Sequence, residues 1–301
     1  MTDETGDISL KDTNLITSSN RQAGFVSLNS ALIRSGVGLA IASGIGYLGW
    51  RKGALTHSGA FGALVSGTVT AGRGGYGRAA LLVGFFVASS LLSRLPERQE
   101  LSFSSFTAKG GRRDAWQVAA NGGASTLVAC FGEGQRYRLS YLGALAAATG
   151  DTWATEIGRR WGGTPRHIFT LQPVDPGVSG GITLTGTLAT VAGGGFIGLL
   201  GIVSGLIDPA FRARKRELLL TGAISGVFGS LVDSLVGATI QEKRWCDDCQ
   251  KRTERPIHTC GSDTSVVGGI RGVDNDVVNL ICTISGSATG WAIERWSNRQ
   301  D

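Results

Sequence analysis

Apolar stretches recur along almost the whole chain, and short polar loops separate them. Each stretch approaches the length of about 20 residues that an α-helix needs to cross a hydrocarbon core of about 30 Å. The pattern predicts an all-α fold, a polytopic transmembrane helix bundle of about eight spans, with a short Cys/His loop before the last span. The expected spans are Ala31–Trp50, Leu55–Ala71, Ala79–Leu95, Ala115–Phe131, Leu139–Ile157, Ile182–Leu206, Leu218–Ile240 and Val277–Trp291.

The composition supports a membrane protein and excludes several other classes. Of the 301 residues, 47 are glycine and 17% are charged, against about 7% glycine and about 25% charged residues in soluble domains. The mean hydropathy of +0.10 excludes a disordered chain, and five cysteines are too few for a disulfide scaffold. The net charge of +6 is scattered through short loops. Nucleic-acid binders cluster their basic residues, so we expect no nucleic-acid partner.

The chain divides into one membrane domain with polar ends. Residues 1–24 are polar and acidic, which predicts a disordered tail, and residues 296–301 form a polar C-terminal end. The expected membrane domain covers residues 25–295, with a hydrophilic Cys/His loop at residues 242–273 inside it. The start of the chain resembles neither a cleavable signal peptide nor an arginine-rich transit peptide. We therefore expect an integral membrane protein of the endoplasmic reticulum or another secretory-pathway membrane.

Small residues four positions apart predict close packing of helix backbones. The pairs Gly194–Gly198 and Gly201–Gly205 share one span, and Gly62–Ser66 lies in the second span. Such pairs let transmembrane helices approach closely. The orientation in the membrane stays open, because most of the loops are basic. The oligomeric state stays open as well.

Polar residues inside or beside the apolar stretches form four clusters, and such residues mark function by default in a membrane. The first cluster begins with Arg112 and Arg113. It continues with Asp114, Gln117 and Asn121, whose spacing of i, i+3, i+7 places them on one helix face. This polar face is expected to point into the bundle.

The second cluster contains Asp151 and Glu156 in the segment GDTWATEIG. Five residues separate the two acids, which places them about 140° apart around a helix. They need not share one ligand unless the helix is broken between them.

The third cluster is a glycine-rich segment that contains Gly177, Ser179, Gly180 and Gly181. Free backbone N–H groups at the start of a helix form an anion site, so we interpret this segment as a phosphate cradle. It is not a Walker A loop, because no Gly-Lys-Ser/Thr follows. An ordinary helix cap with close packing is the alternative.

The fourth cluster joins Asp233, inside one span, with Asp274, Asn275, Asp276 and Asn279 at the start of the last span. Asn275 and Asn279 share a helix face because they are four residues apart. A helix–helix hydrogen bond by Asp233, and helix capping by Asp274 and Asp276, are the structural alternatives.

The hydrophilic loop contains four potential metal ligands: Cys246, Cys249, His258 and Cys260. Two cysteines and an H-x-C pair supply the ligands of a tetrahedral Zn²⁺ site, although only the C-x-x-C pair has the familiar spacing. A structural zinc ion would brace the loop. A reducible Cys246–Cys249 disulfide or free thiols are the alternatives.

These segments together resemble the transmembrane protein 19 family, also called the family of domain of unknown function 92. The resemblance spans roughly residues 25–295 and rests on RRDAWQVAANGG, GDTWATEIG, the Gly-Val-Ser-Gly-Gly-Ile-Thr segment, GSLVDSLVGATIQ and DNDVVN. A plant member of the family is known as a phytyl-phosphate kinase, so the resemblance implies a lipid-phosphate kinase. It implies site residues at Asp114, Asn121, Asp151, Glu156, Ser179, Asp233 and Asn275.

The resulting hypothesis is Mg²⁺-dependent phosphoryl transfer from a nucleotide, CTP or ATP, to an isoprenyl-type lipid phosphate in the membrane. We expect Asp151 and Glu156 to hold Mg²⁺ or orient the acceptor, and Asp114 and Asp233 to add metal-binding charge. The expected phosphate and substrate ligands are Asn121, Arg112, Arg113, the segment 177–181 and Asn275. Nucleotidyl transfer is a close variant of this reaction.

Two other classes remain open from the sequence alone. A transporter or an ion or proton pathway can use the same buried acids. A structural membrane protein explains the glycines but not the acids.

Overall fold

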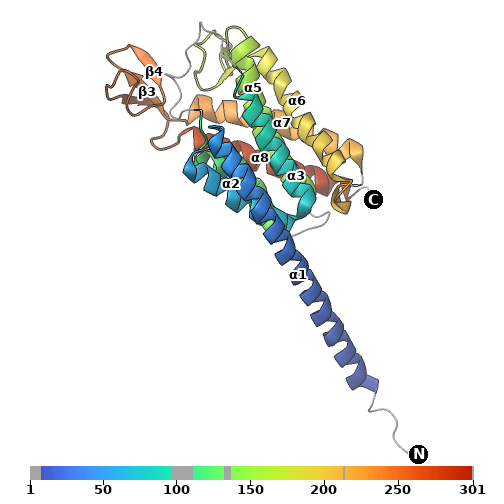
Figure 1. Ribbon diagram of the computed structural model, residues 1–301. Helices are drawn as coiled ribbons and strands as arrows, with labels where there is room; N and C mark the ends of the chain where they lie inside the picture. Colours follow the sequence, from blue (N-terminus) through green and yellow to red (C-terminus); the bar gives the residue numbers. More distant parts are fainter. Residues whose placement is uncertain (1–7, 96–110, 132–136, 213, 300–301) are drawn as a thin grey trace, which may run out of the picture.

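The computed structural model describes residues 8–95, 111–131, 137–212 and 214–299, and within them the chain is an all-helical bundle, as predicted (Figure 1). Each expected apolar stretch overlaps one α-helix. The helices are α1 (Ile8–Arg51), α2 (His57–Val69), α3 (Gly75–Leu92), α4 (Ala115–Cys130), α5 (Arg138–Trp161), α6 (Leu184–Ser204), α7 (Lys215–Thr239) and α8 (Asn275–Ser297).

Three helical segments are long and apolar enough to cross a membrane by themselves, among the residues that the structure describes. They are Ser30–Arg51 of α1 and the whole of α6 and α7. Helix α2 has 13 residues and α4 has 16, which at 1.5 Å per residue gives about 20 and 24 Å. Both are shorter than a hydrocarbon core of about 30 Å. A membrane bundle is therefore supported, whereas a count of eight full spans is not confirmed.

The first helix differs from the prediction at its start. We expected a disordered tail up to residue 24, but α1 is helical from Ile8 and runs unbroken to Arg51. No proline or glycine occurs between Ile8 and Ala23, so nothing in this polar segment interrupts the helix. The N-terminal part of α1 projects beyond the rest of the bundle (Figure 1).

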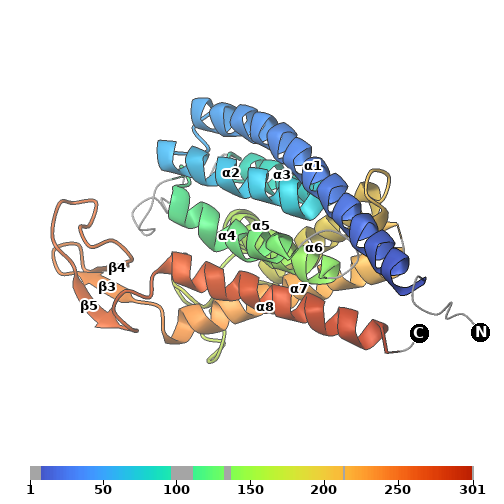
Figure 2. The same ribbon diagram turned by 90° about the horizontal axis from the view of Figure 1, so that it is seen from below.

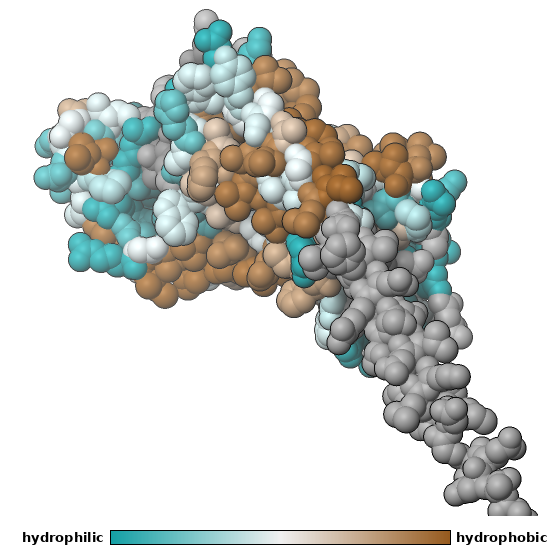
Figure 3. All heavy atoms as spheres, turned by 60° about the horizontal axis from the view of Figure 1, so that its bottom comes forward, coloured by the Kyte–Doolittle hydropathy of each residue, from teal (hydrophilic) through white to brown (hydrophobic). Residues whose placement is uncertain are grey.

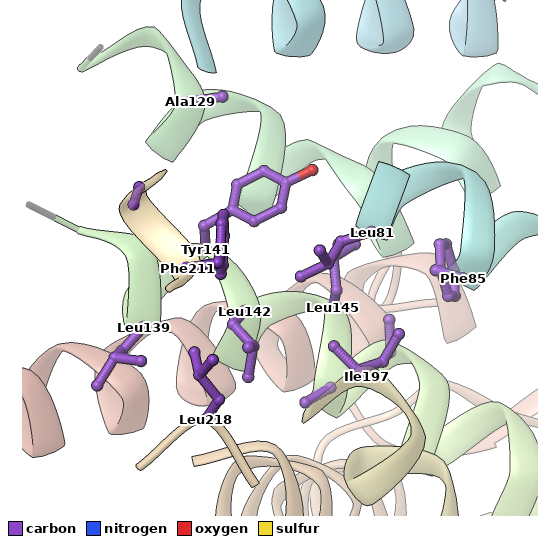
Figure 4. Close-up of a cluster of buried hydrophobic side chains, with 13 residues drawn as sticks. Leu81, Phe85, Ala129, Leu139, Tyr141, Leu142, Leu145, Ile197, Phe211 and Leu218 are labelled. Carbon is purple, nitrogen blue, oxygen red and sulfur yellow. The ribbon is translucent and has the colours of Figure 1, made fainter. Parts of the chain in front are cut away.

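Helix α5 is the centre of the bundle, and it contacts α3, α4, α6, α7 and α8. Its residues from Arg138 to Gly150 are all buried. Leucines and Tyr141 of α5 form the apolar core with side chains from α3, α6 and α7 (Figure 4). The core side chains labelled in Figure 4 include Leu81, Phe85, Leu139, Tyr141, Leu142, Leu145, Ile197 and Leu218.

Glycines allow the backbones of these helices to touch, which confirms the packing role predicted for Gly194. A Cβ atom added to Gly194 would lie 2.2 Å from the carbonyl oxygen of Gly222 on α7. A Cβ atom on Gly143 of α5 would lie 2.2 Å from the carbonyl oxygen of Gly286 on α8. Any larger residue would push these helices apart.

The up-and-down order of the helices brings five helix ends to one end of the bundle, which we call the polar end. The N-termini of α4, α6 and α8 and the C-termini of α5 and α7 meet there. Two short sheets lie at the same end: β1 (Arg166–His167) with β2 (Gly181–Ile182), and β4 (Lys251–Thr253), β3 (Lys243–Cys246) and β5 (Ser265–Gly268) in that order. Figure 2 shows the three-stranded sheet beside the end of α7 and the start of α8.

The surface of the bundle is strongly apolar. On the face in Figure 3, hydrophobic residues gather over the helices and hydrophilic residues over the three-stranded sheet. Large apolar side chains point outward on several helices; Phe61 is 66% exposed and Leu184 78% exposed. A continuous apolar surface of this kind fits contact with lipid rather than water.

The packing predicts opposite results for two adjacent glycines of α6. Gly194→Ala forces a methyl group into the α7 backbone and is expected to destabilise the protein by about 1–3 kcal/mol. Gly195→Ala is the matched control, because no atom lies within 4 Å of its added Cβ, and alanine is a better helix former than glycine. Thermal unfolding in detergent micelles measures both. Equal melting temperatures for the two variants would contradict the proposed α6–α7 contact.

Candidate functional site

A polar cavity of about 540 Å³ lies at the polar end and collects most of the predicted site residues. Helices α4 to α8, the segment between α5 and α6, and the Cys/His loop all contribute to its wall. The predicted residues that line it are Arg113, Asn121, Asp151, Glu156, Gly177, Ser179, Gly180, Gly181, Asp233 and Asn275.

Two carboxylates from adjacent helices, Asp151 of α5 and Asp233 of α7, face the same cavity. The Ser230 hydroxyl donates a hydrogen bond of 3.2 Å to Oδ1 of Asp151. The Oδ2 atom of Asp233 is buried, and no described residue provides a hydrogen-bond partner for it. Asp151 and Glu254 are close enough to Asp233 to interact with it electrostatically. A buried oxygen without a donor, among like charges, is an arrangement that a cation stabilises.

Glu156 also lines the cavity, but an arginine on the same helix neutralises part of its charge. Its Oε2 atom lies 2.5 Å from Nη1 of Arg160, one helical turn further along α5. The α5 helix is continuous from Arg138 to Trp161, so Asp151 and Glu156 keep the separation of about 140° expected from their spacing. Glu156 therefore belongs to the cavity wall, whereas Asp151 is the α5 acid that faces Asp233.

The glycine-rich segment lines the cavity. We had expected it to start a helix, but it does not. Gly177 and Gly180 have positive φ angles of 93° and 83°, which exclude them from a right-handed helix. Gly181 begins strand β2 instead, and α6 starts only after its N-cap residue, Thr183. Gly180 also packs against α7, because an added Cβ would lie 2.5 Å from that of Ala238.

The positive ends of three helices nevertheless point toward the cavity. Thr183 and Gly186 of α6, Gln117 of α4 and Asn275 of α8 lie in the first turn of their helix or next to it, and all line the wall. Helix N-termini carry partial positive charge and bind anions. Arg113, Arg159 and Arg255 add positive side chains to the same wall. The cavity therefore combines carboxylates suited to a cation with groups suited to phosphate.

Two of the predicted catalytic and phosphate-binding residues do not line the cavity. Asp114 is the N-cap of α4: its Oδ1 atom accepts a hydrogen bond of 2.9 Å from the Gln117 backbone N–H, and its own backbone N–H donates one of 3.0 Å to Oε1 of Gln117. Arg112 donates two hydrogen bonds to the Leu55 carbonyl, at 3.0 and 3.2 Å. Both side chains hold α4 and its preceding segment in place. Asp274, which we had considered as a cap, does cap α8 and also lines the cavity.

The sequence interpretation missed several polar residues of the wall, among them Ser230, Gln241, Glu254 and Arg255. Glu254 follows strand β4 of the Cys/His loop. Its Oε1 atom accepts hydrogen bonds from Gln241 Nε2 at 2.8 Å and from the Ser179 hydroxyl at 3.4 Å. Ser230 was detectable, because it lies three residues before Asp233 on one face of α7. Glu254 carried no such signal, since only the fold brings its loop to the cavity.

The four predicted metal ligands also come together, outside the cavity. The ligand atoms of Cys246, Cys249, His258 and Cys260 all lie within 4.8 Å of one another. The five cysteines of the chain are free. Hydrogen bonds with Ser262 and His258 lower the pKa of the Cys260 thiol to about 6. The Cys249 thiol differs, because a hydrogen bond with Cys260 raises its pKa to about 11.

Comparison with known proteins identifies the family. The model of the family described as "Integral membrane protein DUF92" matches residues 40–287. The chain belongs to this family. The match agrees with the resemblance inferred from GDTWATEIG and the other polar segments.

Several relatives extend the comparison over most of the chain. Protein PGR of Arabidopsis thaliana is 33% identical over 69% of this chain and 78% of its own length. An uncharacterized membrane protein of Methanocaldococcus jannaschii is 31% identical over 86% of this chain and 94% of its own length. Protein VTE6, a chloroplastic protein of Arabidopsis thaliana, is 24% identical over 77% of this chain and 63% of its own length. No solved structure matches the chain.

The paired acids predict an unusual effect on stability. Asp233→Asn removes a negative charge beside Asp151 and Glu254, so it is expected to stabilise the metal-free protein, by about 1–3 kcal/mol. Asp208→Asn is the matched control, since Asp208 caps the short helix Pro209–Phe211 and asparagine caps equally well. Thermal unfolding in detergent with a chelator present measures both variants. A lower melting temperature for Asp233→Asn alone would contradict charge repulsion at this site.

Proposed function

We propose that the protein transfers a phosphoryl group, in a Mg²⁺-dependent reaction, from CTP or ATP to an isoprenyl-type lipid phosphate. The observation that carries this proposal is one cavity lined by carboxylates from two helices, three helix N-termini and arginines. Phosphoryl transfer requires this combination, because catalysis depends on positioning and on neutralising phosphate charge rather than on covalent chemistry.

Asp151 and Asp233 are the residues that would hold Mg²⁺. Carboxylate oxygens are the ligands that Mg²⁺ prefers, together with phosphate oxygens. The Oδ2 atom of Asp233 has no hydrogen-bond partner among the residues that the structure describes, which fits a ligand role. When bound, Mg²⁺ supplies positive charge to the phosphates of the nucleotide. Ser230 keeps one oxygen of Asp151 oriented through its hydrogen bond.

The substrate phosphates would lie against the positive parts of the wall. The first turn of α6 and the side chains of Arg113 and Arg255 are suited to bind them. In the reaction, an oxygen of the lipid phosphate forms a bond to the γ-phosphorus of the nucleotide. The bond from this phosphorus to the bridging oxygen breaks, so a nucleoside diphosphate and a lipid diphosphate are formed. The arginines compensate the charge that this transfer redistributes.

Helix α6 suggests how a lipid reaches the cavity. Thr187 and Thr190 line the cavity, whereas Leu184 and Leu188 of the same helix are 78% and 62% exposed. One face of α6 is thus suited to the phosphate and another to an apolar chain in the bilayer. The family resemblance, which includes a plant phytyl-phosphate kinase, supports the same class of acceptor.

Transport of an ion or a proton is the competing function. The predicted acids Asp151, Glu156 and Asp233 converge in one cavity at the polar end. Glu217 and the buried Glu294 lie outside it and pair with Arg138, so these acids form no continuous file through the bundle, which favours an enzyme over a pathway. Proteoliposome flux that Asp233→Asn abolishes, in a protein without transferase activity, would support transport instead.

The reaction is tested with purified protein, phytyl phosphate and γ-labelled CTP or ATP. The wild type is expected to form a labelled lipid diphosphate only with Mg²⁺. Asp151→Asn should reduce the rate by roughly 100-fold or more, because it removes charge that stabilises the transferred group. Asp208→Asn, outside the cavity, serves as the control with wild-type activity. Absence of product from the folded wild type with both nucleotides would refute the proposal.

A further inference from the structure

The Cys/His loop folds into a small sheet that lacks an apolar core of its own. In residues 242–273, the buried residues are Cys246, Thr253, His258 and Thr264. Every aliphatic and aromatic side chain of this loop is at least partly exposed; Val267 and Ile270 are 57% and 55% exposed. Three short strands without buried apolar side chains do not stabilise themselves. A fold of this size requires another source of stability, such as a metal ion or a disulfide.

Two turns of the loop present their ligands to each other. Cys246 ends strand β3, and Cys249 lies in the turn that leads to β4. His258 and Cys260 lie in a second turn, closed by hydrogen bonds between the backbones of His258, Gly261 and Ser262. Gln250 has a left-handed backbone (φ 51°), which a non-glycine residue adopts where its surroundings hold it. Both turns are thus shaped around the four ligands.

The distances between the ligand atoms fit a tetrahedral metal site. The Sγ atoms of Cys246 and Cys260 are 3.6 Å apart, and Nδ1 of His258 is 3.1 Å from Sγ of Cys260. In a tetrahedron with Zn–S bonds of about 2.3 Å, two sulfur atoms are about 3.8 Å apart. A disulfide instead requires about 2.05 Å. Three thiolates and one imidazole are ligands typical of structural zinc, and they leave no coordination position open.

We propose that Cys246, Cys249, His258 and Cys260 bind one structural zinc ion, and that this ion holds Glu254 and Arg255 in the wall of the cavity. The two turns with the ligands flank these residues in the sequence. Thr264 donates a hydrogen bond of 2.6 Å to the Arg255 carbonyl, and Arg244 of β3 donates one of 2.8 Å to Thr264 Oγ1. The zinc-stabilised sheet is thereby connected to the cavity wall, where Glu254 binds Gln241.

The zinc site is tested by measuring the metal content of protein purified without added chelator. The wild type is expected to contain about one zinc ion per chain, and Cys249→Ser and His258→Ala to contain at least tenfold less. Cys130→Ser is the matched control, because Cys130 is an exposed cysteine on α4, and it should retain the zinc. His258→Cys should retain it too, since cysteine also binds zinc. A wild type without zinc, or a Cys249→Ser variant with full zinc content, would overturn the proposal.

The link to the cavity is tested by limited trypsin digestion of the wild-type protein. Removal of zinc by a chelator should increase cleavage at the exposed Lys251 and Arg252, next to Glu254, at least tenfold, and Zn²⁺ should restore protection. Cleavage at the exposed Arg166, outside the loop, is the internal control. Unchanged cleavage after proven loss of zinc would refute the positioning role. Neither measurement depends on catalysis, so failure of the proposed phosphoryl transfer would leave both results interpretable.

Discussion

Direct contact between the backbones of α5, α6, α7 and α8 is the constraint on which the rest of the structure depends. An added Cβ on Gly150 of α5 would lie 3.0 Å from the backbone of Gly226, and one on Gly194 of α6 would lie 2.2 Å from that of Gly222. Lipid provides no hydrophobic driving force between helices, so close van der Waals contact has to hold them together. The high glycine content therefore serves the packing of a membrane bundle.

The same contacts determine where the acids lie. Asp151 directly follows Gly150, and Asp233 lies seven residues after Gly226, on the same face of α7. The Gly150–Gly226 contact thus brings the two carboxylates to one cavity. Ser230, which lies between Gly226 and Asp233 on α7, donates a hydrogen bond to Asp151. The two acids oppose this packing, because like charges repel each other and no described residue donates a hydrogen bond to Oδ2 of Asp233. We expect a bound cation to relieve this repulsion and to stabilise the bundle.

The sequence predicted the helices and most of the cavity because both depend on local patterns. Apolar stretches located α1 to α8 in the part of the chain that the structure describes. Asp151 and Asp233 stood out because they are acids within these stretches. Local patterns do not distinguish a capping acid from a ligand, since either role suits an acid before a helix, and Asp114, predicted as a site residue, caps α4. The sequence also did not show that Gly177 and Gly180 adopt positive φ angles, or that Glu254 reaches the cavity. Gly180 packs against Ala238 of α7, and Glu254 of the Cys/His loop accepts a hydrogen bond from Gln241. Such tertiary contacts leave no local pattern in the sequence.

We propose that Asp151 and Asp233 together bind a divalent cation that also contacts a nucleotide phosphate. The most direct test is an experimental structure with Mn²⁺ and a non-hydrolysable CTP or ATP analogue, in which anomalous scattering locates the metal. We expect Mn²⁺ in the cavity, bound to oxygens of Asp151, Asp233 and the analogue. Ordered Mn²⁺ and nucleotide at another site, with Asp151 and Asp233 contacting neither, would contradict it.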